Sequence, residues 1–254
     1  MLLRKVTQHV KNQNWFAVFI DFIIVVVGVF IGIQVANWND DRAVFKKETQ
    51  ALVALKKEIL ASIDTTESKI SAYKQATAAG KRSMEFINQK KNCEDNCWNR
   101  IVDFMHASQW QGLYASDSSY QNMRSQGFPQ SVAIIDAVEA YLAQNTNNAD
   151  TFVILPEYRS LVRQLIDIDS QEFYWTHCWS FIDGIEKYIL ECPKGISDEQ
   201  AHIIVERILS NSNIKPQLTE WVGAIVSLPA TLGDQNIAAK KAIDLINQEL
   251  ERRK

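Results

Sequence analysis

The feature that most constrains this chain is a long apolar run near its N-terminus. Residues 22–33 carry no polar side chain, and only three strongly polar residues interrupt the stretch between two tryptophans: Asp21, Gln34 and Asn37. A helix rises about 1.5 Å per residue, so the distance from Trp15 to Trp38 is about 34 Å, against a hydrocarbon core of roughly 30 Å. The run predicts a transmembrane helix, with Trp15 and Trp38 as anchors at the two membrane interfaces.

A cleaved signal peptide is the main alternative, because the run is N-terminal and follows Arg4, Lys5 and Lys11. The run is longer than the apolar region of a signal peptide, and no A-x-A-like cleavage site follows it. A buried helix of a soluble core would rarely be so continuous, or be flanked by an aromatic residue at each boundary. Every other apolar segment is shorter or interrupted by charge, so we expect a single span and contact with a lipid bilayer.

The span divides the chain into three predicted parts. These are a short basic cytoplasmic tail over 1–14, the transmembrane helix over 15–38 and an extracytoplasmic α-helical domain over 39–254. Removing Arg4, Lys5, Lys11 and Asp21 from the 27 basic and 30 acidic residues leaves 24 and 29 in the domain, a net charge of −5. This acidic balance argues against nucleic acid as a partner.

Basic residues near the two ends of the span do not decide its orientation. Three precede it and three follow it: Arg4, Lys5, Lys11, Arg42, Lys46 and Lys47. The tail contains no acidic residue, and long C-terminal domains are translocated largely regardless of charge. All four cysteines follow the span, which suits an oxidising compartment. We therefore expect a bacterial inner-membrane protein with a cytoplasmic N-terminus and a periplasmic domain.

One face of the predicted span carries small residues and an acid. Gly28 and Gly32 form a G-x-x-x-G pair, Ala36 continues the series and Asp21 lies on the same face, at about 100° per residue. The pattern indicates close packing against a partner helix, either a second copy or another membrane protein, although glycine is common in membrane helices in general. A lone intramembrane acid makes a poor proton relay, so we favour an interhelical hydrogen bond for Asp21.

Two segments resemble an uncharacterised bacterial family of single-pass membrane proteins, a domain of unknown function. The first combines Asp21 and Gly28 with the juxtamembrane string Gln34-x-x-Asn37-Trp38-Asn39. The second is Tyr120-x-x-Met123-x-x-x-Gly127, followed by Ile134, Ile135 and Tyr141. Gln126 departs from the serine that many members carry there, so this chain lacks that hydroxyl. The resemblance implies a membrane-anchored helical protein without an established activity.

The region after the span predicts an all-α bundle of six or seven helices. An apolar stripe recurs at spacings of three and four through Leu52, Leu55, Ile59, Ile63, Thr66, Ile70 and Tyr73. No Gly or Pro lies between Gly32 and Gly80, so the helix can continue beyond the span. The stripe is short for a coiled coil, which favours packing within the chain's own bundle. Further helical patterns cover 98–109, 130–144, 157–190 with a break at Asp183–Gly184, 197–209 with an N-terminal capping box, and 216–253 with a kink near Pro229 and Gly233. No segment alternates convincingly as a strand.

The cysteines are disulfide candidates: Cys93, Cys97, Cys178 and Cys192. A local Cys93–Cys97 bridge is the simplest option. The alternative joins one of these two residues to Cys192 and leaves Cys178 buried and reduced, and four cysteines allow three pairings in all. On one unbroken helix Cys178 and Cys192 would be about 21 Å apart, so they can pair only if the chain turns near Gly184. A zinc site with His106 or His177 is a weak alternative, because C-x3-C has no second matching pair. We expect neither a metal nor a cofactor.

The function is not apparent from any catalytic motif. The chain contains no G-x-S-x-G, P-loop, dinucleotide fingerprint or H-E-x-x-H, so we expect no enzymatic activity. An aromatic cluster forms either core or a pocket or partner surface: Phe173, Tyr174, Trp175 and Trp179. Core packing is the favoured role for it. The sequence favours a membrane-anchored, non-catalytic interaction or assembly protein. The alternative is a sensor whose bundle binds a small ligand near the aromatic cluster.

Overall fold

The computed structural model of the chain describes residues 15–89, 93–112, 114, 116–151, 153, 155–182 and 185–254, without the side chains of Ala17, Asp95 and Ile185. The predicted cytoplasmic tail, residues 1–14, and the predicted break at 183–184 lie outside these described residues. The chain divides into two compact units, Met1–Val53 and Ala54–Lys254. Each unit is considered by itself.

Helix α2 (Trp15–Gln89) contains the apolar run and continues far beyond it, as the lack of Gly and Pro after Gly32 predicts. By length and composition, it is the one helix among the described residues that is long and apolar enough to cross a membrane. None of the side chains in its most apolar stretch is buried. Phe22 and Phe30, for example, are 62% and 61% exposed.

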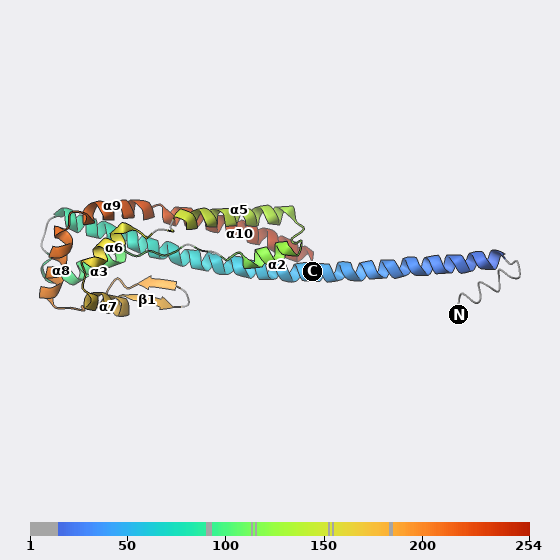
Figure 1. Cartoon of the computed structure of the whole chain (residues 1–254), viewed down its shortest axis with the longest axis horizontal. Helices are drawn as coiled ribbons and strands as arrows, with labels where there is room; N and C mark the ends of the chain where they lie inside the picture. Colours follow the sequence, from blue (N-terminus) through green and yellow to red (C-terminus); the bar gives the residue numbers. More distant parts are fainter. Residues whose placement is uncertain are drawn as a thin grey trace. The chain divides into compact units, whose positions relative to one another are not determined.

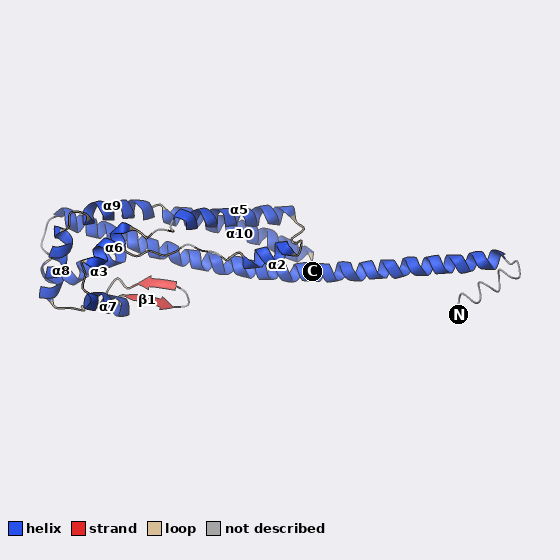
Figure 2. Ribbon diagram, in the orientation of Figure 1, coloured by secondary structure: helices blue, strands red, loops and turns tan. Residues whose placement is uncertain are grey.

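The second unit is all-α apart from one hairpin (Figures 1 and 2). Its elements after α2 are the 3-10 helix η1 (Glu94–Asn96), α3 (Cys97–Ala107), α4 (Ser118–Ser125), α5 (Val132–Thr151), α6 (Glu157–Gln164), α7 (Ile168–His177), β1 (Trp179–Ile182), β2 (Ile185–Tyr188), α8 (Asp198–Ser210), α9 (Ile214–Ile225) and α10 (Leu228–Arg252). The all-α prediction is confirmed. The described residues hold eight α-helices after α2, more than the six or seven expected, and α4 was not predicted.

Local chemistry explains where several of these helices begin. The Ser197 side chain accepts a hydrogen bond from the Gln200 backbone N–H, which confirms the predicted capping box of α8. Pro156 precedes the first residue of α6. The predicted kink near Pro229 is a full break at Val226–Ser227, and Pro229 takes the second position of α10, where the missing N–H has no helical acceptor to lose.

The segment after α7 contradicts the sequence prediction. Residues 157–190 were expected to be mostly helical without strands, but β1 and β2 pair antiparallel, with Trp179 opposite Tyr188. Three of the four residues of β1 are aromatic or β-branched, as are Ile185 and Tyr188 of β2, and such residues fit a pleated surface well. The antiparallel pairing brings Cys178 and Cys192 together at the base of the hairpin, where they form a disulfide with Cα atoms 4.9 Å apart.

The second unit is built around residues 54–89 of α2. In Figure 1, α5, α9 and α10 lie along this part of α2, and α3, α6, α7, α8 and the hairpin gather at one end. The predicted apolar stripe is buried here, with Leu55 and Tyr73 each 1% exposed, which favours the bundle interpretation over a coiled coil. Tyr141 of α5 donates a hydrogen bond to Ser62 of α2 at 2.6 Å.

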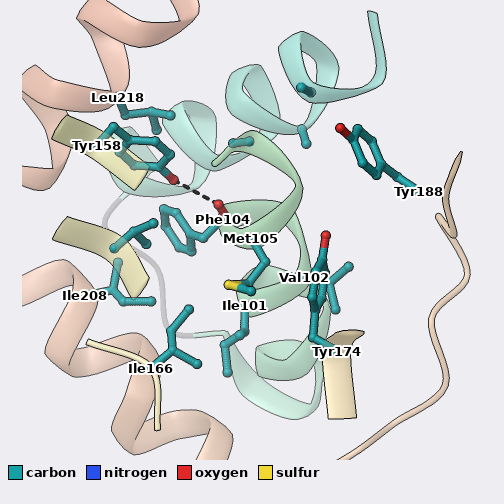
Figure 3. Packing of buried hydrophobic residues seen from close by; sticks show 14 of the residues in the cluster. Ile101, Val102, Phe104, Met105, Tyr158, Ile166, Tyr174, Tyr188, Ile208 and Leu218 are labelled. Carbon is teal, nitrogen blue, oxygen red and sulfur yellow. Dashed lines mark hydrogen bonds between the residues drawn. The ribbon is translucent and has the colours of Figure 1, made fainter. Parts of the chain in front are cut away.

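Helix α3 lies within the core, and nine of its eleven residues are buried (Figure 3). Ile101, Phe104 and Met105 are fully buried among side chains of α6, α7, α8 and α9. The Tyr158 hydroxyl of α6 donates to the Phe104 carbonyl at 3.1 Å, and Trp221 of α9 donates to the Ala107 carbonyl at 2.7 Å. The Trp221 bond gives the Ala107 carbonyl, in the last turn of α3, a donor from outside the helix. The Tyr158 bond adds a second donor to the Phe104 carbonyl, which also accepts from the Ser108 N–H.

Two helical glycines of the second unit give a matched test of this packing. A methyl group on Gly80 of α2 would overlap Cγ2 of Val222, whereas one on Gly223 of α9 would meet nothing within 4 Å. We expect Gly80→Ala to destabilise the fold by about 1–3 kcal/mol through overpacking. Gly223→Ala should be neutral or stabilise by up to about 1 kcal/mol, because alanine is the better helix former. Thermal unfolding of the full-length protein in detergent checks both, and equal effects would contradict the close contact between α2 and α9.

Candidate functional site

The first unit carries the predicted packing face on α2. A methyl group placed on Gly28 or Gly32 would meet no other atom within 4 Å, so the backbone is open at both positions. Ala36 is exposed, and Asp21 is half-buried with its Oδ2 atom lacking a hydrogen-bond partner among the described residues. The predicted anchors Trp15 and Trp38 are 74% and 62% exposed.

The juxtamembrane string is also exposed. Gln34, Asn37 and Asn39 lie on the surface of α2. The Arg42 guanidinium lies 5.6 Å from the centre of the Trp38 ring, at cation–π distance. This string therefore has no packing role in its own unit beyond the Arg42–Trp38 contact described here.

The second unit contains a buried polar network that ties the hairpin to α2. Gln111 lies at its centre, and its side-chain amide donates to Glu186 and to the Tyr188 hydroxyl, both at 2.9 Å. Its backbone carbonyl accepts from the Tyr73 hydroxyl at 2.8 Å, and its N–H donates to the same hydroxyl at 3.1 Å. One residue of the α3–α4 connection thus joins strand β2 to α2.

Two arginines of α6 extend this network. Arg159 donates to the Ser108 carbonyl at 3.0 Å, and Arg163 donates to the Ser108 hydroxyl at 3.1 Å. The Arg163 guanidinium also lies over the Trp175 ring, 4.9 Å from its centre. Such stacking suits arginine, whose planar cation is weakly hydrated.

Positive charge exceeds negative charge in this network. Lys69 donates to the Gly112 carbonyl, and burial lowers its pKa while the charge of Glu186 opposes that shift. Burial and the neighbouring Arg159 lower the pKa of Arg163 to about 10. Glu186 acts electrostatically on Lys69, Arg159 and Arg163 alike, so three cations share this carboxylate.

The predicted aromatic cluster is largely structural. Tyr174 is 1% exposed and accepts a hydrogen bond from Gln109 at 2.8 Å. Phe173 meets the edge of Trp98, with ring centres 5.6 Å apart, and Trp175 meets Trp179 at 5.3 Å. Phe173, Trp175 and Trp179 remain half-buried. A cavity of about 440 Å³ in this unit has other walls, which include Tyr158 and Trp221.

His106 does not meet the Cys93–Cys97 pair. It is 1% exposed, and its Nε2–H donates to the Cys178 carbonyl at 3.3 Å. Burial lowers its pKa, which favours the neutral ring. His106 packs between Tyr174 and Tyr188, with ring centres 5.4 and 5.5 Å away (Figure 3 shows both tyrosines).

The four cysteines form the two local pairs. Cys93 and Cys97 are bonded, with Cα atoms 4.8 Å apart, which agrees with the local bridge predicted from the sequence as the simplest option. Among the described residues, the ligand atoms of Cys93, Cys97 and His202 lie within 4.8 Å of one another and could hold a metal ion. The histidine of this group is His202, not His106 or His177 as the sequence suggested.

No family model, no curated protein and no solved structure matches this chain. The resemblance carried by the juxtamembrane string and the Tyr120 segment therefore stays a prediction.

The buried tyrosines predict a loss of stability at alkaline pH. Burial raises the pKa of Tyr73 to about 12, and the charge of Glu186 adds to the shift. The unfolded chain releases this proton near pH 10, so the stabilisation is intact below that pH and is lost as the pH rises toward 12. We expect the free energy of unfolding to fall by on the order of 2–3 kcal/mol over this window through Tyr73 alone.

Tyr73→Phe isolates this contribution. It should cost about 1 kcal/mol at neutral pH through the lost hydrogen bonds, yet flatten the decline above pH 10. Tyr114→Phe is the matched control, because Tyr114 is 71% exposed. Denaturant unfolding at a series of pH values measures both effects, and an unchanged alkaline slope in Tyr73→Phe would contradict the assignment.

Proposed function

We propose that this protein is a single-pass membrane protein that works as a non-catalytic interaction or assembly module. The observation that carries the proposal is the N-terminal part of α2, whose apolar side chains are exposed on every side. In water this exposed apolar surface would be unfavourable and would promote aggregation, whereas in lipid it is the expected surface of a spanning helix. The lack of a recognisable catalytic motif in the sequence is consistent with this role.

The mode of interaction follows from the small-residue face. Gly28, Gly32 and Ala36 allow another helix backbone to approach closely, and van der Waals packing drives such association in lipid. Asp21 has an oxygen without a partner among the described residues, and a donor on the facing helix would satisfy it. The partner is a second copy of this chain or another membrane protein.

The orientation we propose places the N-terminus in the cytoplasm of a bacterium and the helical domain in the periplasm. Both cysteine pairs lie beyond the apolar run and are at disulfide distance, with Cα atoms 4.8 and 4.9 Å apart. Disulfides persist in oxidising compartments and are rare in the cytosol. The resemblance to a family of single-pass bacterial membrane proteins supports the same arrangement.

The alternative function is an extracytoplasmic sensor that binds a small ligand. The excess of Lys69, Arg159 and Arg163 over Glu186, next to the half-buried Trp175, favours an anionic ligand for such a site. Chemical crosslinking in native membranes distinguishes the two functions. A reproducible protein partner supports the assembly role, and a small anion that raises the melting temperature of the protein supports the sensor.

Substitutions on α2 test the interaction face directly. We expect Gly28→Ile and Gly32→Ile to weaken association in a bacterial two-hybrid assay, because each adds a branched side chain at the point of closest approach. Asp21→Leu should also weaken it by removing the interhelical hydrogen bond. Val26→Ile is the control, since it lies roughly 160° away from Gly28 on the helix. Equal signals from all four variants would remove this face from the interaction.

The orientation has its own test. Alkaline phosphatase fused to the C-terminus should be active, because it folds and forms its disulfides only outside the cytoplasm. Green fluorescent protein at the same position should stay dark after export in unfolded form. A bright fluorescent fusion with an inactive phosphatase fusion would place the domain in the cytoplasm.

A further inference from the structure

The Cys93–Cys97 pair faces an unusual neighbour. Nδ1 of His202, on α8, lies 3.8 Å from Sγ of Cys93 and 3.9 Å from Sγ of Cys97. Cys93 and Cys97 are 6% and 0% exposed, whereas the His202 side chain is 42% exposed. The sulfurs are thus protected, and the histidine edge of the group is open to solvent.

Glu206 fixes how His202 presents its ring. Nε2 of His202 lies 3.1 Å from Oε1 of Glu206, one helical turn further along α8. A carboxylate only accepts hydrogen bonds, so Nε2 carries a ring proton, and in the neutral ring Nδ1 presents its lone pair to the two sulfurs. The sulfurs of a disulfide carry no hydrogen to donate. In that neutral tautomer three potential ligand atoms face one another with no hydrogen between them, an arrangement that suits a bound cation.

The distances fit a tetrahedral thiolate–imidazole site. Zinc–sulfur bonds of about 2.3 Å and zinc–nitrogen bonds of about 2.0–2.1 Å give a sulfur–nitrogen edge of roughly 3.6 Å. The observed 3.8 and 3.9 Å are close to this value. Only the sulfurs would have to separate from each other, to roughly 3.8 Å, once the bond between them is broken.

The two elements that supply the ligands also favour the charges involved. Cys97 is the first residue of α3, and the N-terminus of a helix stabilises a thiolate. The histidine–carboxylate pair on α8 is the arrangement that commonly orients and polarises a metal-bound imidazole. With three protein ligands and an open side, a water molecule would complete the coordination of the ion.

We propose that Cys93, Cys97 and His202 form a redox-gated zinc site, closed by the disulfide and opened when a dithiol reduces it. The dithiol gives two electrons and two protons, becomes a disulfide itself and leaves Cys93 and Cys97 as thiols. Zn²⁺ then displaces the two thiol protons and binds both thiolates and the neutral Nδ1 of His202. Glu206 is a positioning residue, because it acts on the ion through His202. The site does not depend on the proposed membrane topology. The topology determines only the redox compartment, and hence what fraction of the protein has Cys93 and Cys97 reduced.

Zinc binding by the full-length protein in detergent tests the proposal. A phosphine reduces the disulfide, since its phosphorus takes up oxygen from water while the two sulfurs take up the protons. We expect the reduced protein to bind one Zn²⁺ in competition with a chromophoric chelator, and the untreated protein to bind none. Co²⁺ should give the sulfur-to-cobalt charge-transfer band of a thiolate site, which a merely structural role for these residues would not produce.

Variants assign the ligands. Glu206→Gln should weaken zinc binding by about tenfold or more. His202→Ala should weaken it further, and it should still fold, because His202 is partly exposed. His177→Ala and the double variant Cys178→Ser, Cys192→Ser are matched controls that should keep the zinc stoichiometry. Circular dichroism on each reduced variant confirms that the helical fold is retained.

Three results would overturn the proposal. The first is a reduced wild-type protein that binds no zinc. The second is binding that survives in the double variant Cys93→Ser, Cys97→Ser, since the ion would then lie elsewhere. The third is a folded His202→Ala variant with wild-type zinc affinity.

Discussion

Exposed apolar surface costs roughly 25 cal/mol per Å² in water, and the N-terminal part of α2 exposes such surface all round. The same helix changes character further along the chain. From Leu55 onward most of its apolar residues form one stripe, which the second unit buries, and its other faces are polar apart from the exposed Leu60. A helix with an all-round apolar part and a one-sided part suits two surroundings, lipid for the first and a folded bundle for the second. The proposed function depends on this contrast.

Within the bundle, a polar network adds to the buried Tyr188 ring and the Cys178–Cys192 disulfide in securing the least regular element. A two-stranded hairpin is marginal by itself, and β1 and β2 have no third strand among the described residues. Gln111 anchors the hairpin to the bundle, because it forms hydrogen bonds with Glu186 and Tyr188 of β2 and with Tyr73 of α2. Buried polar networks are costly unless nearly every member is satisfied, so they define one arrangement sharply. The same network concentrates Lys69, Arg159 and Arg163 around Glu186, which makes it the natural place for a ligand if the sensor alternative is correct.

The long periodic segments were predictable from sequence because their apolar residues repeat with the helical period. The stripe along α2 and the cap of α8 at Ser197 are the clearest cases. The hairpin was not predicted because strands of four residues are too short to show a clear alternation of apolar and polar residues. The aromatic residues just before it belong to helix α7, and nothing in the sequence clearly marks where that helix ends. Helix α4 has only eight residues, of which Tyr120 and Met123 are buried, so its pattern is equally short.

The site residues were harder to predict for a different reason. Gln111 lies in an irregular connection, where no periodicity marks a residue as buried. His202 lies 105 residues from Cys97, and on α8 it occupies a half-buried position that resembles any other on an amphipathic helix. A local motif such as C-x3-C indicates half of a metal site, but its partner comes from the packing of α3 against α8. That packing is a tertiary property, which a single sequence does not display.

The two disulfides differ in what they do for the fold. Cys178 and Cys192 are 14 residues apart and close the base of the hairpin, whereas Cys93 and Cys97 are four residues apart in a local turn. Chain-entropy arguments assign about 3 kcal/mol to the first link and about 2 kcal/mol to the second. The shorter link lies within one local segment, so it holds no pair of distant elements together, and α3 and α8 both contribute residues to the common core. Reduction of the Cys93–Cys97 disulfide, which lies beside His202, should therefore cost the fold less stability than reduction of the Cys178–Cys192 disulfide.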